Sequence, residues 1–367
     1  MNVLHICCNY AGTTVFRDLF GHLSRAGVAQ QVYVPEKRAA DMGKYESPAY
    51  PVTYSLIVRP WDRALYYTKA RRAVPDLRAR MDLSRVSLVH AHTLFTDGGI
   101  AYRLGLPYVV SVRFTDIEYF YKYMPHLRAY GEKILRAARR VVFLSPESRE
   151  KVLSRYVKDR AAIEPHCTVM PNGIDAAWLD AAPRPAPEDR VTIGFCGKLT
   201  ARKQPVKALE AAALYAQASG RRVRFLVAGD GELRQALLDA PQAEGLLDYR
   251  GRLGSVDEMK AFYRECDVLL VPSTAETFGL CYLEAMSQGV SVLYTRGQGF
   301  DGQFPEGAAG FHVCASDTRE MAERIADCLQ GYEARSRRCV ELSRTLEWSG
   351  IAARVKAMYE EAEACGS

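Results

Sequence analysis

The stretch that most limits what this chain can fold into is residues 268–293. Residues 268–272 (VLLVP) are few, apolar and ended by proline, which is typical of a short buried strand. A helix capped by Ser273 or Thr277 is expected next, and Gly289 ends it before a second apolar strand. A strand, a turn, a helix and another strand make one unit of a parallel sheet covered by helices. The sequence therefore predicts an α/β fold.

The turn of this unit is a candidate anion site. The first amides of a helix have no acceptor within the helix, so backbone donors near Phe278, Gly279 and Leu280 are expected to bind a phosphate. Glu276 and Glu284 lie about two helical turns apart if both share the helix. Carboxylates accept hydrogen bonds only, which suits a ribose diol at Glu284 and a sugar ring at Glu276. The alternative is a solvated helix face for Glu284 and a simple first-turn charge for Glu276.

The same residues resemble a known family. Residues 276–286 (ETFGLCYLEAM) are similar to the E-x7-E signature of retaining glycosyltransferases of family 4, E-[TS]-F-G-L-x-x-L-E-A-M. The resemblance spans nearly the whole chain, is strong over 169–290 and weak over 35–85. It implies the GT-B fold, in which two doubly wound Rossmann-like domains face each other across a cleft. It also implies transfer of a sugar from a nucleoside diphosphate. The sequence contains no D-x-D motif, the usual sign of a metal-dependent transferase, so no metal site is predicted.

Composition breaks divide the chain. The Ala/Pro-rich residues 181–188 interrupt all periodicity, as a linker does, and the strand and helix alternation restarts at 191. We therefore predict an acceptor-binding Rossmann-like domain over 1–180, a linker over 181–190, a nucleotide-sugar-binding domain over 191–345, and a helix over 346–367. The resemblance implies that this last helix crosses back to the first domain.

Basic and glycine-rich turns in the second half are candidate donor contacts. Gly197 follows a predicted strand and opens a basic segment, where Lys198 and Lys203 are placed to neutralise a diphosphate leaving group. Two ordinary surface lysines are the alternative. The family motif G-R-L-x-x-x-K has arginine where Lys198 stands, so charge is kept while the two-pronged guanidinium is lost. Gly229, in a G-x-G turn, and Arg252, in a turn expected to hold the nucleotide base, complete this set.

The first half offers weaker candidates. Gly12 follows the first predicted strand, where it is expected either to contact the donor diphosphate or the acceptor, or to serve only the conformation of the turn. His92 is expected to pack in the core or to face the acceptor. Arg113 stands where many family members carry a histidine that touches the donor sugar, and Asp116 either orients an acceptor hydroxyl or pairs with Arg113. Tyr119 begins an aromatic segment that suits a sugar or lipid acceptor, although core packing explains it equally well.

Charge is uneven along the chain. The net charge is +6, with +9 in residues 1–180 and −3 in the remainder. A basic half with aromatic residues suits an anionic membrane surface or a lipid diphosphate, and solvated helix faces are the alternative. Nucleic acid is not expected as a partner because no recognition motif accompanies the charge.

The ten cysteines form no C-x-x-C pair and are predicted to be reduced thiols. No apolar run approaches the roughly 18 residues of a membrane span, and residues 1–8 lack a signal-peptide layout.

These observations predict a cytoplasmic retaining glycosyltransferase that needs no metal or other cofactor, with a nucleoside-diphosphate sugar as co-substrate. The acceptor is expected to be a saccharide or lipid-linked, in cell-surface polysaccharide synthesis such as capsule or lipopolysaccharide, at the inner face of the plasma membrane. Two alternatives stay open: a nucleotide-sugar epimerase or phosphorylase on a similar fold, and a non-catalytic binding subunit. A dinucleotide oxidoreductase is disfavoured because its glycine fingerprint is incomplete in both halves.

Overall fold

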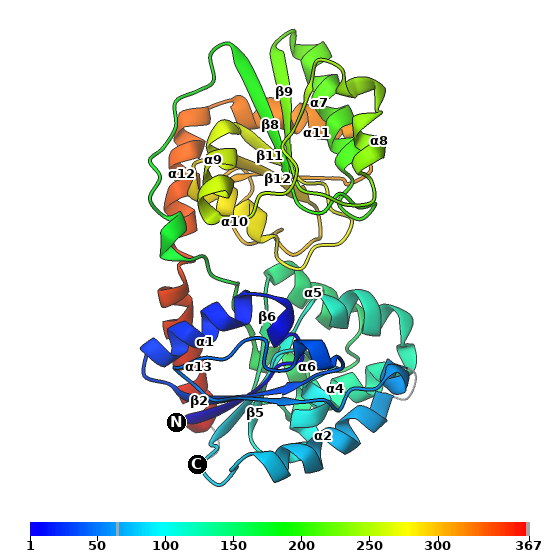
Figure 1. Ribbon diagram of the computed structural model, residues 1–367, viewed down its shortest axis with the longest axis vertical. Helices are drawn as coiled ribbons and strands as arrows, with labels where there is room; N and C mark the ends of the chain where they lie inside the picture. Colours follow the sequence, from blue (N-terminus) through cyan, green and yellow to red (C-terminus); the bar gives the residue numbers. More distant parts are fainter. Residues whose placement is uncertain (64–65, 365–367) are drawn as a thin grey trace. The chain divides into compact units, whose positions relative to one another are not determined.

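The computed structural model describes residues 1–63 and 66–364 and divides the chain into two compact units (Figure 1). Unit 1 comprises residues 1–173 and 348–367, and unit 2 comprises residues 174–347. Cys365, one of the predicted free thiols, lies outside the described residues. The nine described cysteines are all free.

Unit 1 is built on a parallel sheet whose seven described strands run in the order β3-β2-β1-β4-β5-β6-β7. The inner strands β4 and β5 are buried along their whole length, as strands covered by helices on both faces are. Their bounds are β1 (Asn2–Ile6), β2 (Ala29–Pro35), β3 (Val52–Ser55), β4 (Leu88–Ala91), β5 (Tyr108–Val112), β6 (Arg140–Phe143) and β7 (Cys167–Val169).

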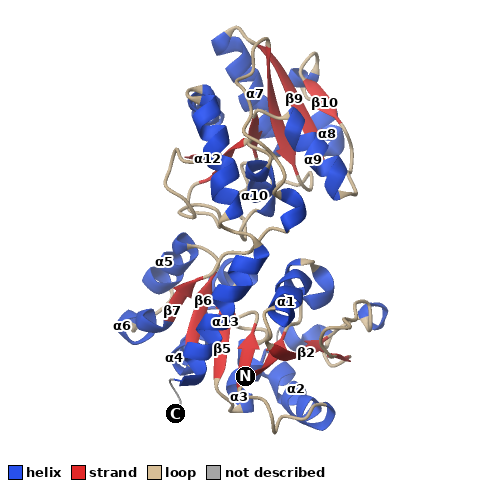
Figure 2. Cartoon of the chain, turned by 90° about the vertical axis from the view of Figure 1, so that its left-hand side faces the viewer, coloured by secondary structure: helices blue, strands red, loops and turns tan. Residues whose placement is uncertain are grey.

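Helices cover both faces of this sheet (Figure 2). The last helix, α13, packs against α1, β4 and β5. Helix α3 contacts both α2 and α4. The helices are α1 (Val15–Arg25), α2 (Tyr66–Arg80), α3 (Gly98–Leu104), α4 (Arg128–Ala137), α5 (Pro146–Arg155), α6 (Arg160–Ile163) and α13 (Trp348–Ala364). A one-turn 3-10 helix, η1 (Tyr10–Gly12), follows β1, and a π-type segment, η4 (Asp116–Tyr121), follows β5.

Unit 2 repeats the design, with six described strands in the order β10-β9-β8-β11-β12-β13, all parallel. The strands are β8 (Arg190–Cys196), β9 (Arg222–Ala228), β10 (Leu247–Tyr249), β11 (Val268–Leu270), β12 (Ser291–Thr295) and β13 (Gly310–Val313). The helices are α7 (Pro205–Ser219), α8 (Arg234–Leu238), α9 (Val256–Glu265), α10 (Leu280–Ser287), α11 (Thr318–Leu329) and α12 (Tyr332–Arg344). Helix α7 contacts α8 and α11, and α10 contacts α9 and α12.

The division between the units falls before the predicted linker. Ile174 forms a bridge with Glu347, and the Ile174 amide donates to the Leu346 carbonyl at 2.9 Å. The Trp178 carbonyl accepts a hydrogen bond from the Gln288 side chain, and Asp180 pairs with Lys260 at 2.6 Å. Residues 174–180 are thus held by unit 2, and the Pro-rich 181–190 runs within that unit.

Two strands were not predicted from the sequence. β3 lies in the region without a motif, and β13 contains a glycine and a histidine and has two half-exposed residues. Both are outer strands of their sheets, so each has a neighbouring strand on one side only and needs no continuous apolar run. The last strand of unit 1, β7, ends at Val169, four residues before the division between the units. No helix in the part of the chain that the structure describes is long and apolar enough to cross a membrane.

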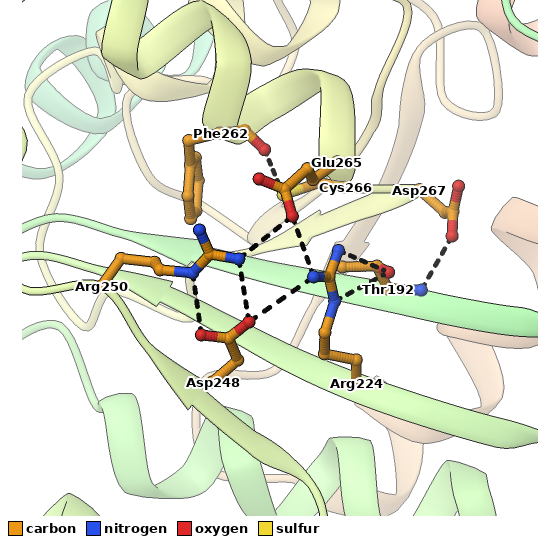
Figure 3. Close-up of polar contacts among 8 residues, drawn as sticks. All are labelled: Thr192, Arg224, Asp248, Arg250, Phe262, Glu265, Cys266 and Asp267. Atoms are coloured by element: carbon orange, nitrogen blue, oxygen red, sulfur yellow. Dashed lines mark hydrogen bonds and ion pairs between the residues drawn. The ribbon is translucent and has the colours of Figure 1, made fainter.

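A network of ion pairs links two strands and a helix of unit 2 (Figure 3). The Arg224 guanidinium on β9 donates to Glu265 at 2.8 Å, lies 3.5 Å from Asp248, and reaches the Thr192 hydroxyl of β8. Arg250 closes the network by pairing with Asp248 at 2.8 Å and with Glu265 at 3.2 Å. Its hydrogen bonds hold the pKa of Asp248 below its ordinary value. The network fixes the end of α9 over the edge of the sheet.

We expect Arg224→Met to lower the free energy of unfolding by about 1–2 kcal/mol, because its guanidinium is largely buried and serves two strands and a helix. Arg222→Met is the matched control, since Arg222 lies on the same strand, is 76% exposed and reaches only Asp189 at 3.8 Å. Urea unfolding followed by circular dichroism measures both. Equal effects of the two substitutions would contradict the stabilising role of the network.

Candidate functional site

The start of α10, after the turn that follows β11, is not capped as predicted. Helix α10 begins at Leu280, and its N-cap is Gly279 in the left-handed conformation (φ 82°), without any side-chain cap. The prediction that Ser273 or Thr277 caps this helix was therefore wrong. A Cβ on Gly279 would lie 2.3 Å from the Tyr282 ring, so both conformation and space require glycine. The helix consequently starts with amides that no side chain satisfies.

Glu276 lies in the loop before α10 and forms an ion pair with Lys203. Each of the two side chains is only 11% exposed. The Ser273 hydroxyl lies 3.4 Å from the same carboxylate oxygen, and the Thr277 amide donates to the other oxygen at 3.0 Å. Burial lowers the pKa of Lys203, but the neighbouring Cys281 and Glu276 outweigh it and raise the pKa above its ordinary value. Lys203 is therefore a permanent cation beside this carboxylate.

The second glutamate of the signature is held on the body of α10. Glu284 accepts a hydrogen bond from the hydroxyl of the fully buried Tyr263 at 2.9 Å. Burial raises the pKa of Glu284, and the bond from Tyr263 opposes this effect. The side chain is therefore not on a solvated helix face. Because Glu276 precedes the helix, the two glutamates do not share one helical register.

The remaining predicted donor contacts of unit 2 fall into two groups. Lys198 and Arg252 are exposed, whereas the Phe278 side chain is buried and Leu280 is half-buried. Gly197 and Gly229 serve the packing of the backbone: a Cβ on Gly229 would lie 1.8 Å from the Gly197 carbonyl oxygen. The Gly229 amide donates to the Gly251 carbonyl at 2.8 Å. The turns after β8, β9 and β10 are thus joined to one another, and the donor roles of these residues stay predictions.

Three predicted residues of unit 1 lie together at the ends of β4 and β5. The Asp116 carboxylate accepts the backbone amides of Leu94 and Phe95 at 3.0 Å and of Arg113 at 2.8 Å. Burial raises the pKa of Asp116 to about 6, and these amides oppose the shift. The Arg113 side chain donates to the His92 carbonyl at 3.0 Å. In this structure Asp116 ties backbone segments together, and Arg113 bonds to it through the main chain.

Arg113 has further neighbours that define its place. Its guanidinium lies 4.8 Å from the Phe16 ring centroid and 3.5 Å from the Asn172 side-chain oxygen. Burial lowers its pKa. Gly12 lies in η1, where a Cβ would lie 2.3 Å from Asn9 Oδ1, so a larger residue there would displace the Asn9 side chain. Tyr119 lies in η4 with 38% of its surface exposed and its ring 6.2 Å from that of Tyr123.

His92 belongs to a buried group of three imidazoles that the sequence did not reveal. His5 on β1 and His90 on β4 are its partners. The Gln30 amide nitrogen donates to two oxygens, so its Oε1 accepts from His5 Nε2 at 2.9 Å. His5 Nδ1 must then accept from His92 Nε2, also at 2.9 Å. His92 Nδ1 is left as a buried acceptor without a partner among the described residues.

The three imidazoles are close enough to raise the question of a metal. Their candidate ligand atoms lie within 4.8 Å of one another. The rings of His90 and His92 are stacked, however, with centroids 4.0 Å apart and an angle of 29°. Stacked rings direct their nitrogen lone pairs side by side rather than at one point, unlike the tetrahedral arrangement of zinc ligands. His90 is also engaged at both nitrogens, with Tyr359 and Ser111. The arrangement favours a hydrogen-bonded core over a metal centre.

This cluster makes stability depend on pH. Burial lowers the pKa of His5 to about 3 and those of His90 and His92 well below their ordinary value. Unfolding frees imidazoles that bind protons below about pH 6.5, so the stabilisation is complete above that pH and falls as the pH drops toward 3. At pH 5.5 each of the three histidines is expected to lower the free energy of unfolding by about 1.4 kcal/mol relative to its value at pH 8.

Urea unfolding of wild type and His90→Gln at pH 7.5 and 5.5 measures this effect, with the exposed His126→Gln as control. His90→Gln should reduce the pH dependence by about a third, and His126→Gln should preserve it. Asp116 titrates in the same range with the opposite sign, but it is present in all three proteins and cancels in the comparison. An unchanged pH dependence in His90→Gln would contradict the prediction.

Several residues beside Glu276 were missed by sequence reasoning. Gln298 accepts the Glu276 amide at 3.0 Å, and the Gly299 amide donates to the Glu276 carbonyl at 3.2 Å. Gln204 bonds to residues far along the chain. Tyr263, which binds Glu284, carries no sequence signal because its partner is 21 residues away.

Comparison with known proteins shows the family. The protein-family model described as "Glycosyltransferase Family 4" matches residues 12–178. The family model described as "Glycosyl transferases group 1" matches residues 178–344. Together they span residues 12–344, which includes most of both units. The chain belongs to the family 4 glycosyltransferases, and its two Rossmann-like units have the GT-B fold.

Relatives and solved structures agree with this assignment. A D-inositol 3-phosphate glycosyltransferase of Mycolicibacterium vanbaalenii is 28% identical over 61% of this chain and 54% of its own length. A phosphatidyl-myo-inositol mannosyltransferase of Mycobacterium leprae is 28% identical over 59% of this chain and 62% of its own. The chain thus spans about half to three fifths of the length of these relatives.

Two solved structures have the same fold. Sucrose-phosphate synthase of Thermosynechococcus elongatus superposes with a TM-score of 0.78 at 17% identity over the whole of both chains. Anabaena Alr3699/HepE, solved in complex with UDP, gives a TM-score of 0.74 at 16% identity over 98% of this chain and 100% of its own. At these identities the likeness concerns the fold alone.

Proposed function

We propose that this chain transfers a sugar, with retention of configuration, from a nucleoside-diphosphate donor bound by unit 2 to a hydroxyl of a saccharide or lipid-linked acceptor bound by unit 1. The observation that carries the proposal is the Lys203–Glu276 pair beside the uncapped amino terminus of α10. A cation, free helix amides and a hydrogen-bond acceptor for sugar hydroxyls are what a diphosphate sugar requires in one place.

Each residue of this group has a defined part in the proposed reaction. The bond between the anomeric carbon and the diphosphate oxygen breaks, a bond to the acceptor oxygen forms on the same face, and the acceptor proton passes to the departing phosphate. Lys203, Lys198 and the first amides of α10 stabilise the charge that develops on the diphosphate. Glu276 orients the sugar ring, and Glu284 accepts from the ribose diol. No protein nucleophile is required.

Arg113 is proposed to act near the donor phosphate, and Asp116 is proposed to act at the acceptor side through the loop it holds. The cation of Arg113 replaces the hydrogen bond of the histidine found in many family members. His92, which is buried, supports this loop through its carbonyl bond to Arg113. Tyr119 remains the exposed candidate for contact with an acceptor.

The comparisons suggest which substrates to test first. Anabaena Alr3699/HepE was also solved with UDP-glucose, which supports uridine nucleotides as first candidates for the donor. The relatives are named for inositol 3-phosphate and phosphatidyl-myo-inositol, which supports cyclitol phosphates and lipid-linked cyclitols as acceptors. We propose cell-surface glycan synthesis, of which capsule and lipopolysaccharide are examples, as the broader setting. The galactosyltransferase WaaB of the lipopolysaccharide outer core has the same fold, with a TM-score of 0.74 at 13% identity.

Isothermal titration calorimetry with the nucleoside diphosphates of all five bases tests donor binding. We expect one of them to bind, and to bind without magnesium. Lys203→Met and Glu284→Ala should each weaken that binding roughly ten- to a hundredfold, because each removes a charge-assisted hydrogen bond. Lys207→Met, on helix α7 close to Lys203 in sequence, is the control and should bind as wild type does. Failure of wild type to bind any nucleoside diphosphate would overturn the proposal.

Product analysis separates transfer from the other reactions of this fold. Incubation with the matching nucleotide sugar should release nucleoside diphosphate only when an acceptor is added, and the new glycosidic bond should keep the anomeric configuration of the donor. Donor consumption that ignores the acceptor would instead favour an epimerase or phosphorylase. Binding without any turnover over a wide acceptor panel would favour a non-catalytic subunit.

We further propose that unit 1 contacts an anionic membrane. Its exposed aromatic rings form two groups: Tyr67 and Tyr102 both contact Tyr130, and Tyr119 contacts Tyr123, which is 64% exposed. The buried Tyr66 contacts both Tyr130 and Phe120 and links the two groups from beneath the surface. Arg103 lies over Tyr67, and Lys122 lies over Tyr123. Aromatic rings with cations suit the interface of an anionic bilayer.

Co-sedimentation with phosphatidylglycerol vesicles at low salt tests this surface. We expect binding that weakens several-fold in Tyr123→Ser combined with Lys122→Gln and that falls with added salt. Val256→Ser in unit 2, which removes a comparably exposed apolar side chain, is the control. Equal sedimentation with neutral vesicles, or none with anionic ones, would exclude the membrane contact.

A further inference from the structure

Gln204 has a backbone conformation found at no other non-glycine residue in the described part of the chain. Its φ and ψ are 54° and 52°, in the left-handed region. It also precedes Pro205, the first residue of α7, and a residue before proline is normally extended. A side chain with a Cβ is strained in this region, so glycine would be the easier choice. Strain of this kind persists only where the surroundings hold it in place.

The Gln204 side chain supplies that hold. Its Nε2 donates to the Pro272 carbonyl at 3.0 Å and to the Ala315 carbonyl at 2.8 Å. Both hydrogens of the amide are therefore used on carbonyl oxygens, which fixes the orientation of the amide group. Pro272 lies just after β11, and Ala315 lies just after β13. One side chain thus joins the turns that follow three strands of the sheet, because its own turn follows β8.

These bonds are part of a seam between residues 200–204 and residues 272–276. The Thr274 amide donates to the Arg202 carbonyl at 2.8 Å, and the Arg202 guanidinium donates to the Ala275 carbonyl at 2.9 Å. Lys203, between Arg202 and Gln204, reaches across the same seam to Glu276. The lysine is therefore flanked on both sides by contacts that tie its backbone to the loop carrying its partner.

We propose that Gln204 is a positioning residue: its amide clamps the turn after β8 onto the loops after β11 and β13 and thereby holds Lys203 against Glu276 for the donor diphosphate. This inference rests on the proposed function for its consequence in catalysis, whereas the clamp itself rests on the geometry of the turn. A flexible lysine loses conformational entropy when it binds a ligand. A clamped backbone reduces this loss, because part of the ordering is already present before binding. The strained conformation keeps the Gln204 amide aimed at its two carbonyls while Lys203 faces the carboxylate.

The test compares two substitutions that both remove the clamp, of which only one relieves the backbone strain. Gln204→Gly relieves the left-handed conformation and removes the clamp, whereas Gln204→Ala removes the clamp and keeps the strain. Gln204→Lys retains a donor that is able to reach the carbonyls and serves as the conservative rescue. Gln235→Ala, which removes an exposed side-chain amide that donates to Asp239 at the end of α8, is the matched control.

Hydrogen exchange measures the clamp without substrate. Peptides covering 198–204 and 272–276 should exchange at least fivefold faster in Gln204→Gly than in wild type, while the melting temperature stays within about 3 °C because strain is relieved. Gln204→Lys should restore slow exchange, and Gln235→Ala should leave both segments unchanged. Unchanged exchange in Gln204→Gly would overturn the proposal.

Titration and kinetics then measure the consequence for the site. Gln204→Gly should bind the nucleoside diphosphate about tenfold more weakly and raise KM for the donor, while KM for the acceptor stays within twofold. A merely structural role would instead lower the melting temperature and the active fraction without changing KM. If wild type binds no nucleotide, the proposed function fails and hydrogen exchange alone decides the clamp. If wild type binds and Gln204→Gly binds equally well, the positioning role is excluded.

Discussion

The whole structure depends on the parallel pairing of every described strand. Parallel strands need helices on both faces, and they all end at the same edge of the sheet. In unit 2 this constraint brings the turns after β8, β11 and β13 together, although up to 111 residues separate Gln204 from Ala315. Lys203 and Glu276, 73 residues apart, meet at this edge. The proposed donor site is therefore a consequence of topology before it is a consequence of individual side chains.

Burial then decides what each charged group is able to do. In unit 1, the oxygens of Asp116 are already occupied by backbone amides. Of the core histidines, His5 bonds to His92 and Gln30, and His90 bonds to Ser111 and Tyr359. These groups hold the ends of β4 and β5 in place. In unit 2, the amino terminus of α10 has no side-chain cap, and Lys198 is exposed. The side chains and amides proposed to bind the donor diphosphate therefore lie at the start of α10 and in the turn after β8.

Sequence reasoning succeeded where local pattern decides the structure. Continuous apolar runs such as that of β11 predicted the inner strands, and the family signature pointed to Glu276 and Lys203, which the structure places in contact. It failed where contacts over long sequence distances decide. β3 and β13 have a neighbour on one side only and lack an apolar run, and residues 174–180 belong to unit 2 because Asp180 meets Lys260. The capping of α10 was missed because Gly279 and the Tyr282 ring, rather than a hydroxyl, set its start.

The least predictable residues are those that support the signature rather than belong to it. Gln204 gives no pattern of its own: a glutamine before a proline predicts an extended residue, not a left-handed one. Its role becomes visible only when the carbonyls of Pro272 and Ala315 lie within reach of one amide. The ion pair between Lys203 and Glu276 could form in many geometries, because a lysine side chain has four rotatable bonds. A fixed backbone on both sides of Lys203 removes most of that freedom, so the precision of the pair comes from its neighbours.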